Sequence, residues 1–255
     1  MNVVVLAKYI PNPTGTPQLG EDLLLVREGV EGGLDPGDEP AIEAALEITE
    51  QAGGEVTVVS MGPAVAMEAV RKALSIGAHK GVLITDDALR GADALVTATV
   101  LSAGIQLREF DLVLAAVEST DGYTGTVPQT LAEFLGVPAL TFARKFELRE
   151  GTIRIERQTE GGYQVVESPL PALVTVTAGA TAPRYPTLKG IMAAKQKPVE
   201  QLALSDLGLS ADDVKPIQAV TGVEDAPERK AGEVIEDGGT AADRVVAFLR
   251  DAKVI

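Results

Sequence analysis

A doubly wound α/β fold with a mostly parallel sheet is predicted by two patterns in the first half of the chain. Short apolar runs alternate with longer amphipathic stretches from residue 2 to about residue 137. The runs are continuously apolar, as expected for strands that are covered on both faces. Repeated strand–helix units with short connections place such strands side by side and in parallel, between two layers of helices.

Each element of this half follows from its local sequence. Strands are expected at residues 3–7, 56–59, 81–84 and 112–116, with a possible short strand at 23–27. Helices are expected at residues 39–52, 64–76, 92–107 and 129–135. The first helix has the clearest ends, because Asp38 is a typical N-cap residue and Gly53 with Gly54 stops the helical pattern.

The pattern changes after Pro138. Four strands without intervening helices are expected at 140–148, 152–159, 163–168 and 172–177, and these extend the same sheet. Residues 178–240 are rich in Pro, Gly and charge, and a final helix is expected at 242–249. This part has too little apolar surface to fold alone, so we expect it to wrap around a neighbouring protein.

The predicted organisation is therefore an α/β domain over residues 1–177, with additional strands from about residue 139, and an arm over residues 178–255. The expected fold is a doubly wound, mostly parallel, Rossmann-like (adenine nucleotide alpha hydrolase-like) sheet with added strands and an extended C-terminal arm.

Composition narrows the functional classes. The 255 residues are 45% hydrophobic, which allows a sizeable core, and no apolar run approaches the roughly 20 residues that span a bilayer. The chain has no cysteine, which excludes disulfides, thiolate metal sites and thiol catalysis. Its single histidine, His79, leaves little material for general-base catalysis or metal binding. The start of the chain lacks the features of a secretion signal, so a soluble, cytoplasmic protein without a metal is expected.

The charge disfavours nucleic acid as a partner. Lys and Arg number 22 against 37 Asp and Glu, which gives a net charge of −15. This balance repels phosphate backbones unless basic residues cluster. They cluster modestly once, at Arg184, Lys189, Lys195 and Lys197.

Ligands of doubly wound sheets bind beyond the carboxyl ends of the strands, where the strand order reverses. Four segments are expected on that side: residues 6–8, 35–38, 60–63 and the loop 116–127. The loop combines hydroxyl side chains and two glycines just before a helix, which suits a phosphate held by N–H and O–H groups. It has neither the Walker spacing nor the Gly-x-Gly-x-x-Gly spacing, so a strand–helix connection without a ligand is an equal alternative.

Other candidate residues favour simpler roles. Asp86 and Asp87 are expected to cap a helix or face solvent, and His79 is expected at the surface. Met61 and Met67 are expected to pack in the core, although Met61 stands at a strand end where an adenine could rest. Glu118 and Asp121 are interpreted as acceptors for ribose or backbone groups. No nucleophile–base arrangement emerges, so the chain is interpreted as a binding protein without catalytic residues.

Three separate stretches resemble the β subunits of electron transfer flavoproteins. Residues 155–166 read IERQTEGGYQVV and are followed by PALVT at 171–175. Residues 182–195 read APRYPTLKGIMAAK and are similar to the recognition loop of that family. Residues 60–63, the helix to residue 74, and Gly77 with Ala78 fit as well. The resemblance covers essentially the whole chain.

The resemblance implies a heterodimer. Members of the family pair with an α subunit that holds most of an FAD, and the β subunit buries an AMP in the crevice described above. In an electron-bifurcating subset, a second FAD occupies that crevice. By similarity, the nucleotide contacts would come from Leu6, Asp35, Pro36, Gly37, Asp38, Met61, Ala116, Val117, Glu118, Ser119, Thr120, Asp121, Gly122, Tyr123, Thr124, Gly125, Thr126 and Val127.

The resemblance also implies a route for electrons. The recognition loop, with Arg184, Tyr185, Leu188, Ile191 and Met192, would bind flavin-dependent dehydrogenases such as acyl-CoA dehydrogenase. Leu188 would be its apolar anchor, unless it packs on its own subunit. Electrons would pass from the dehydrogenase to the flavin of the heterodimer and then to a membrane-linked quinone reductase, with no part of the chain embedded in the membrane.

Some positions depart from the family pattern. Ala116 and Gly125 stand where relatives often carry Gly and a polar residue, and Gln158 replaces an acidic residue found in some relatives. Pro13 replaces an aromatic residue of some members. Two alternatives therefore stay open: a bifurcating β subunit with its own FAD, and a stand-alone adenine-nucleotide-binding stress or sensor protein.

Overall fold

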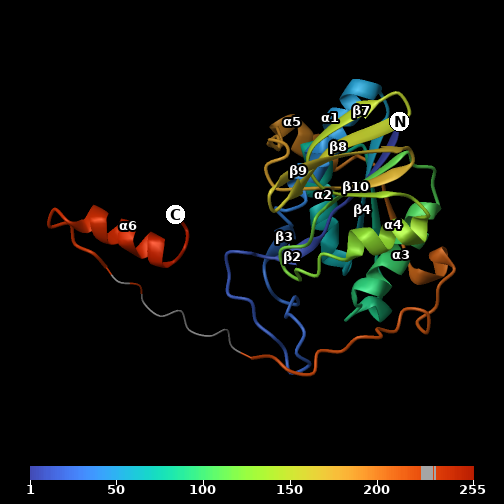
Figure 1. Ribbon diagram of the computed structural model, residues 1–255. Helices are drawn as coiled ribbons and strands as arrows, with labels where there is room; N and C mark the ends of the chain where they lie inside the picture. The colour runs from blue at the N-terminus through green and yellow to red at the C-terminus, as the bar shows by residue number, and fades with distance from the viewer. Residues whose placement is uncertain (225–231, 233) are drawn as a thin grey trace. The chain divides into compact units, whose positions relative to one another are not determined.

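The computed structural model describes residues 1–224, 232 and 234–255 (Figure 1). The described residues form two compact units, Met1–Thr221 and Gly222–Ile255. The first unit contains the sheet and helices α1 to α5. The second contains one helix, α6 (Ala241–Asp251), none of whose residues is buried.

The first unit is built on a nine-stranded sheet with the order β11-β5-β4-β1-β6-β10-β7-β8-β9. Neighbours from β11 to β7 run parallel, and β8 and β9 add an antiparallel extension. The strands are β1 (Asn2–Leu6), β4 (Glu55–Met61), β5 (Lys80–Ile84), β6 (Leu112–Ala116), β7 (Ala139–Arg149), β8 (Thr152–Thr159), β9 (Gly162–Pro169), β10 (Ala172–Val176) and β11 (Val199–Leu202). A separate two-stranded ribbon pairs β2 (Tyr9–Pro11) with β3 (Gly32–Leu34).

Helices cover both faces of the sheet. The helices of the first unit are α1 (Glu39–Ala52), α2 (Met67–Ile76), α3 (Ala94–Gln106), α4 (Val127–Leu135) and α5 (Leu188–Ala194), with short 3-10 turns at Ala64–Ala66, Asp87–Leu89 and Leu204–Leu207. Residues of α1 and α2 form one core with alternate residues of the strands, such as Val3 and Val5. Residues of α3 and α4 form a second core with the intervening strand residues, such as Val4 and Val113. The doubly wound prediction is confirmed.

The strand order of the sheet reverses at β1, because later strands are added first on one side of β1 and then on the other. The chain runs from β1 to β4 and β5 on one side, then returns to β6 on the other side of β1. In β1, Leu6 pairs with Val59 of β4, and Val5 pairs with Leu114 of β6. The carboxyl ends of these three strands therefore meet at one edge, which is the place where such folds bind ligands.

Several details differ from the sequence-based expectations, and β2, β3 and α5 are among the elements that were not expected. Residues 23–27 form no strand but only an isolated bridge between Leu19 and Leu25, because Leu23 adopts a positive φ of 58° and turns the chain. Strand β11 was not expected, because half of its four residues, Glu200 and Gln201, are exposed polar residues at a sheet edge. Since β11 and α5 pack within the first unit, the predicted boundary at residue 177 lies inside that unit.

Candidate functional site

Three of the predicted binding segments meet at the edge where β1, β4 and β6 end. Leu6 and Met61 lie at the ends of their strands, are half-buried, and pack against the core on the α3 and α4 side. The loop after β6 begins at Ala116, which is buried. The segment 35–38 reaches the same place from the end of β3, because the N–H of Asp35 donates to the carbonyl of Lys8 at 2.9 Å.

Asp35 joins two of these segments to each other. Its carboxylate is fully buried and accepts the backbone N–H of Thr120 at 2.7 Å and the hydroxyl of Thr120 at 2.8 Å. It also accepts the N–H of Gly37 at 2.8 Å. Both carboxylate oxygens are therefore bonded within the protein, and Asp35 acts on the site by fixing the loop after β6.

Asp121 forms a second link between these segments, through ion pairs. Its side chain is only 4% exposed and accepts the ammonium group of Lys8 at 2.6 Å and the guanidinium of Arg27 at 2.7 Å. Burial alone would raise the pKa of Asp121, but the charges and hydrogen bonds of Lys8 and Arg27 outweigh it and lower this pKa. Lys8 also donates to the hydroxyl of Ser119 at 3.2 Å. The loop is thus held by ionic contacts at its centre.

Asp38 occupies the N-cap position of α1, as predicted, but its side chain caps nothing there. Instead, Oδ2 accepts the backbone N–H of Lys8 at 2.7 Å. Burial raises the pKa of Asp38 well above its ordinary value, and the nearby charge of Asp35 adds to the effect. The expected capping bond is absent because the backbone of Asp38 is helical, with φ −83° and ψ −21°, rather than extended.

The rest of the loop after β6 contains backbone N–H groups that are not bonded within the described residues. Within the residues that the structure describes, the backbone N–H groups of Gly122, Thr124 and Gly125 have no protein acceptor. Gly125 and Tyr123 both adopt positive φ, the left-handed conformation that occurs in anion-binding backbone turns. The amide oxygen of Gln129, in the first turn of α4, is buried without a partner among these residues. Free donors beside a helix start and the apolar Leu6 and Met61 fit the phosphate and base of a nucleotide.

The remaining predicted loop residues differ in exposure. Glu118, Gly122, Tyr123, Thr124 and Thr126 are exposed, Val117, Ser119, Thr120, Gly125 and Val127 are half-buried, and in the other segment Pro36 is exposed and Gly37 half-buried. Sequence reasoning missed Arg27 entirely. It lies in the Pro- and Gly-rich excursion between β2 and β3, and no local pattern there indicates a partner ninety-four positions away.

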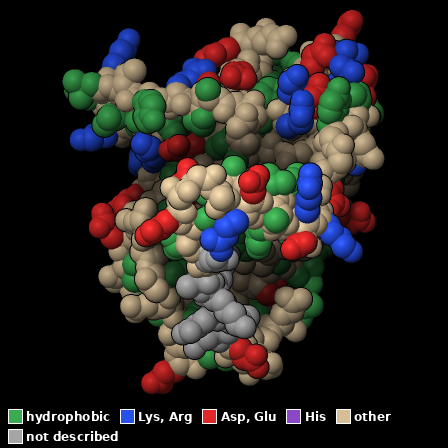
Figure 2. All heavy atoms as spheres, turned by 60° about the vertical axis from the view of Figure 1, so that its left-hand side comes forward, with side chains coloured by type: hydrophobic (Ala, Val, Ile, Leu, Met, Phe, Trp, Pro, Cys, Tyr) green, Lys and Arg blue, Asp and Glu red, His purple; other side chains and the backbone are tan. Residues whose placement is uncertain are grey.

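The predicted recognition segment forms a second exposed feature around α5. Tyr185 is 91% exposed, Leu188 76%, Met192 66% and Ile191 45%. Figure 2 shows apolar and basic side chains side by side across the upper part of the face it presents. Large apolar groups at these exposures are unusual unless another molecule covers them.

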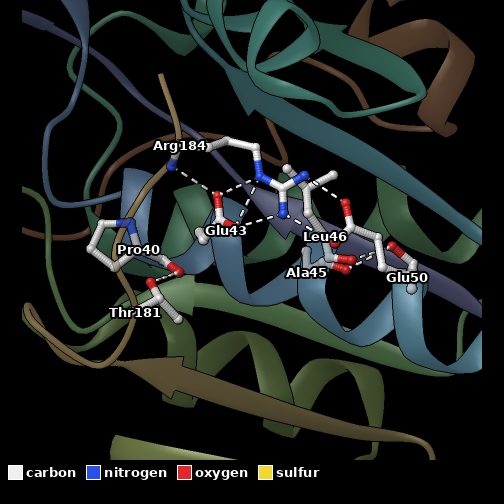
Figure 3. A network of polar contacts seen from close by, with 8 residues as sticks. Pro40, Glu43, Ala45, Leu46, Glu50, Thr181 and Arg184 are labelled. Atoms are coloured by element: carbon white, nitrogen blue, oxygen red, sulfur yellow. Dashed lines mark hydrogen bonds and ion pairs between the residues drawn. The ribbon is translucent and has the colours of Figure 1, made fainter. Parts of the chain in front are cut away.

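Arg184 behaves differently from its four neighbours in this segment. Its guanidinium donates to Glu43 at 2.7 Å and to Glu50 at 2.5 Å, both on α1, and its backbone N–H also donates to Glu43 (Figure 3). The hydroxyl of Thr181 donates to the carbonyl of Pro40 at 3.0 Å. The hydrogen bonds that Arg184 donates to Glu50 and Glu43 raise its pKa above the ordinary value. Arg184 therefore fixes the start of the recognition segment on α1.

The simpler roles expected for His79, Asp86, Met61 and Met67 are confirmed. Asp121 differs from the interpretation as an acceptor for backbone groups, because it accepts the side chains of Lys8 and Arg27. His79 is exposed and accepts the N–H of Val56 at its Nδ1, and Asp86 caps a 3-10 turn by accepting the N–H of Ala88. Met61 and Met67 pack against the two cores. The described residues contain no group of His, Asp or Glu placed to hold a metal ion. No helix among them is long and apolar enough to cross a membrane.

Gln158, one of the departures from the family pattern, lies near the end of β8, away from β1, β4 and β6 in the strand order. It lines an open hollow of about 470 Å³ together with Arg144, Lys145 and residues of the β10–α5 connection. A second hollow of about 460 Å³ lies at the opposite edge of the sheet, near Asn2 and Glu55. Neither of these two hollows is lined by residues at the carboxyl ends of β1, β4 and β6, so strand topology and hydrogen bonding alone mark the candidate ligand site there.

The fold and this edge define a doubly wound α/β protein with a polar, donor-rich loop at its topological switch point. The profile of the electron transfer flavoprotein domain matches residues 22–207. The electron transfer flavoprotein subunit beta of Mycobacterium tuberculosis (strain ATCC 25618 / H37Rv) is 40% identical over 100% of this chain and 99% of its own length. This chain belongs to the electron transfer flavoprotein β-subunit family.

Two further relatives show the breadth of the family. The electron transfer flavoprotein subunit beta of Bacillus subtilis (strain 168) is 37% identical over 89% of this chain and 90% of its own length. The caffeyl-CoA reductase-Etf complex subunit CarD of Acetobacterium woodii is 35% identical over 98% of this chain and 96% of its own length. The sequence-based resemblance is thus confirmed over nearly the full chain.

Proposed function

We propose that this chain is the β subunit of a cytoplasmic, heterodimeric electron transfer flavoprotein. The heterodimer takes electrons from flavin-dependent dehydrogenases, such as acyl-CoA dehydrogenase, and passes them to a membrane-linked quinone reductase. The 40% identity to a relative of that name over the whole chain carries this proposal. The absence of a nucleophile–base pair in the sequence supports a carrier subunit rather than an enzyme.

In this proposal the crevice at the ends of β1, β4 and β6 holds AMP. The free N–H groups of Gly122, Thr124 and Gly125 would bind the phosphate, and Leu6 and Met61 would pack against the adenine. Asp35 and Asp121 hold the loop in the binding conformation through Thr120 and Lys8. The FAD of the heterodimer would supply the redox chemistry. The residues of this chain would bind and orient the AMP and support the loop around it.

The test is the nucleotide content of the assembled protein. The chain is co-expressed with a candidate α subunit, the purified complex is denatured, and the released nucleotides are identified and counted. One FAD and one AMP per heterodimer support the proposal. A chain that purifies alone as a homodimer with bound ATP would replace it with a stand-alone nucleotide sensor.

A bifurcating β subunit is the second candidate, and the likeness to a subunit named for a caffeyl-CoA reductase-Etf complex favours it. In that case a second FAD, rather than AMP, would occupy the crevice. Two FAD and no AMP per heterodimer, together with reduction of the complex by NADH, would select this candidate. One FAD and no reaction with NADH would reject it.

The second unit supports an α-subunit partner. In α6, Val245, Val246 and Phe248 are exposed, with Phe248 at 68%, and the helix is amphipathic without a buried residue. An amphipathic helix of eleven residues needs a partner surface for stability. We therefore expect deletion of residues 222–255 to weaken association with the α subunit, measured by co-purification, while the first unit keeps its fold.

A further inference from the structure

Helix α5 carries Leu188, Ile191 and Met192 of the recognition segment, yet it has only seven residues. Isolated helices of this length are unstable in water. Most of its side chains face outward, and only Ala194 is buried. Its conformation therefore depends on contacts with α2, against which it packs.

The two helices cap each other's carboxyl ends. Arg71 of α2 donates to the carbonyl of Ala194 at 2.6 Å and to that of Lys197 at 2.9 Å, at the end of α5. Lys197 in turn donates to the carbonyls of Leu74, Gly77 and Ala78 at 2.8, 3.3 and 2.6 Å, at the end of α2. Cations at carboxyl ends satisfy carbonyls that the helix leaves unbonded and oppose the negative end of its dipole.

The approach of the two helices is also close. A Cβ on Gly190 would lie 2.5 Å from the carbonyl oxygen of Ser75, so only glycine allows the observed separation. The hydroxyl of Thr187 accepts the N–H of Gly190 at 3.0 Å and caps the start of α5. Burial lowers the pKa of Lys197, because the charged ammonium group is partly removed from water. Both ends and the near face of α5 are thus fixed.

We propose that Arg71 and Lys197 are positioning residues that hold α5 in one orientation, so that Tyr185, Leu188 and Met192 form a preorganised docking surface for the partner dehydrogenase. This inference rests on the proposed function, because the surface is argued to receive a dehydrogenase. Neither Arg71 nor Lys197 belongs to the apolar surface itself. A surface that is ordered before binding loses less conformational entropy on association.

The surface fits a partner of definite chemistry. Leu188 and Met192, four positions apart, lie on one side of the helix and suit an apolar pocket. Lys189 and Lys195 are exposed and have no ion-pair partner among the described residues. They would stand at the rim of the contact, where acidic groups on the dehydrogenase would speed association. The occupant is therefore a dehydrogenase surface with an apolar pocket and an acidic rim.

The test compares four variants of the co-expressed heterodimer. Lys197→Met and Arg71→Gln remove one capping interaction each, Leu188→Ala alters the surface directly, and Lys215→Met removes an exposed lysine elsewhere. The readouts are FAD per heterodimer, the KM and kcat of a flavin dehydrogenase with the heterodimer as electron acceptor, and hydrogen exchange of the α5 amides.

For Lys197→Met and Arg71→Gln we expect the KM to rise about tenfold while kcat and FAD content stay unchanged. Exchange should become faster in residues 188–194 and stay unchanged in the sheet, and Lys215→Met should match the unaltered protein. If Lys197→Met does not assemble, Arg71→Gln supplies the measurement.

Three results would overturn the inference in different ways. If Leu188→Ala raises the KM but neither capping variant does, α5 docks the dehydrogenase without needing its caps, and the proposed function stands. If Leu188→Ala also leaves the KM unchanged, the docking role of this surface fails as well. Faster exchange throughout the first unit would show that the caps support global stability only.

Discussion

The ammonium nitrogen of Lys8 lies 2.6 Å from Oδ1 of Asp121, so the segment just after β1 and the loop after β6 hold each other. The two residues are 113 positions apart in the chain. Arg27 approaches the other carboxylate oxygen from the excursion between β2 and β3. One carboxylate therefore connects three segments around the candidate nucleotide site, and its removal should affect both stability and binding.

Replacement of Asp121 by Asn should lower the free energy of unfolding by about 1 to 2 kcal/mol at neutral pH, because two cations lose their partner. The loss is moderate because the side chains of Lys8 and Arg27 are 38% and 40% exposed. Nucleotide retained by the purified heterodimer should also fall. Urea unfolding and nucleotide release measure the two effects, and Glu133→Gln, an exposed change at the far end of α4, is the control.

The same substitution has a defined pH dependence. The pKa of Asp121 is lowered in the folded protein, so its stabilisation is present above its ordinary pKa and is lost as pH falls through the lowered value. The difference between the original protein and Asp121→Asn should therefore shrink in acid. A difference that grows as the pH falls would contradict the ion-pair assignment.

Asp38 should show the opposite behaviour. Its pKa is raised by burial, so the folded protein favours the protonated carboxyl. Stability should fall as pH rises from the ordinary pKa of 3.8 through the raised value, because the unfolded chain releases the proton first. Asp38→Asn keeps an acceptor for the N–H of Lys8 and cannot ionise, so it should be more stable than the original protein at pH 8.

Urea unfolding across the range from pH 4 to pH 8 measures this difference, with Asp38→Ala as the comparison. The alanine variant also loses the acceptor for Lys8 and should be less stable than Asp38→Asn at every pH. Equal stability of the original protein and Asp38→Asn at pH 8 would mean that the carboxylate is ionised in the fold at little cost.

Replacement of Arg184 by Gln should destabilise the protein by about 2 kcal/mol, because Glu43 is left buried without its cation. The side chain of Glu43 is 5% exposed, while that of Arg184 is 38% exposed and limits the loss. The double change Arg184→Gln with Glu43→Gln should recover part of the stability. A double-mutant cycle by thermal unfolding measures the coupling, and additive effects would show that the two groups act independently.

Leu188→Ala should leave stability within about 0.5 kcal/mol, because the side chain is 76% exposed. If Leu188 anchors the dehydrogenase, the KM for the heterodimer should rise about tenfold or more, as for a buried apolar residue at the centre of an interface. Leu107→Ala, an exposed leucine just after α3, is the matched control. Equal KM values for the two variants would remove Leu188 from the contact.

Most of the α/β core could be predicted from local sequence, because strands covered on both faces must be apolar throughout. The runs at β1, β5 and β6 are of this kind, and β7, β8 and β9 are separated by turns at Gly151 and Gly162. Two incorrect strand predictions also follow from this reliance on local apolar pattern. Residues 23–26 are apolar and half-buried, but the positive φ of Leu23 turns the chain there, and β11 is a polar edge strand whose pairing with β5 has no local signal.

The segments of the candidate site could be predicted from the sequence, but the hydrogen bonds and ion pairs that join them could not. The loop 116–127 and the segment 35–38 could be placed at the carboxyl edge because parallel strands end together. The sequence did not reveal that Asp35 bonds Thr120, that Asp121 bonds Lys8, or that Arg27 takes part at all. The ligand of the crevice and the dehydrogenase surface of α5 stay predictions.

The sequence by itself determined the alternation of strand and helix, the family, and the segments that gather at the ligand edge, because these depend on local pattern and on the order of elements. Only the tertiary structure decided which charges meet. Arg184 on Glu43, and Arg71 and Lys197 on each other's helix ends, join residues more than 100 positions apart. Hydrogen bonds need contact within about 3 Å, and only the folded chain sets distances on that scale.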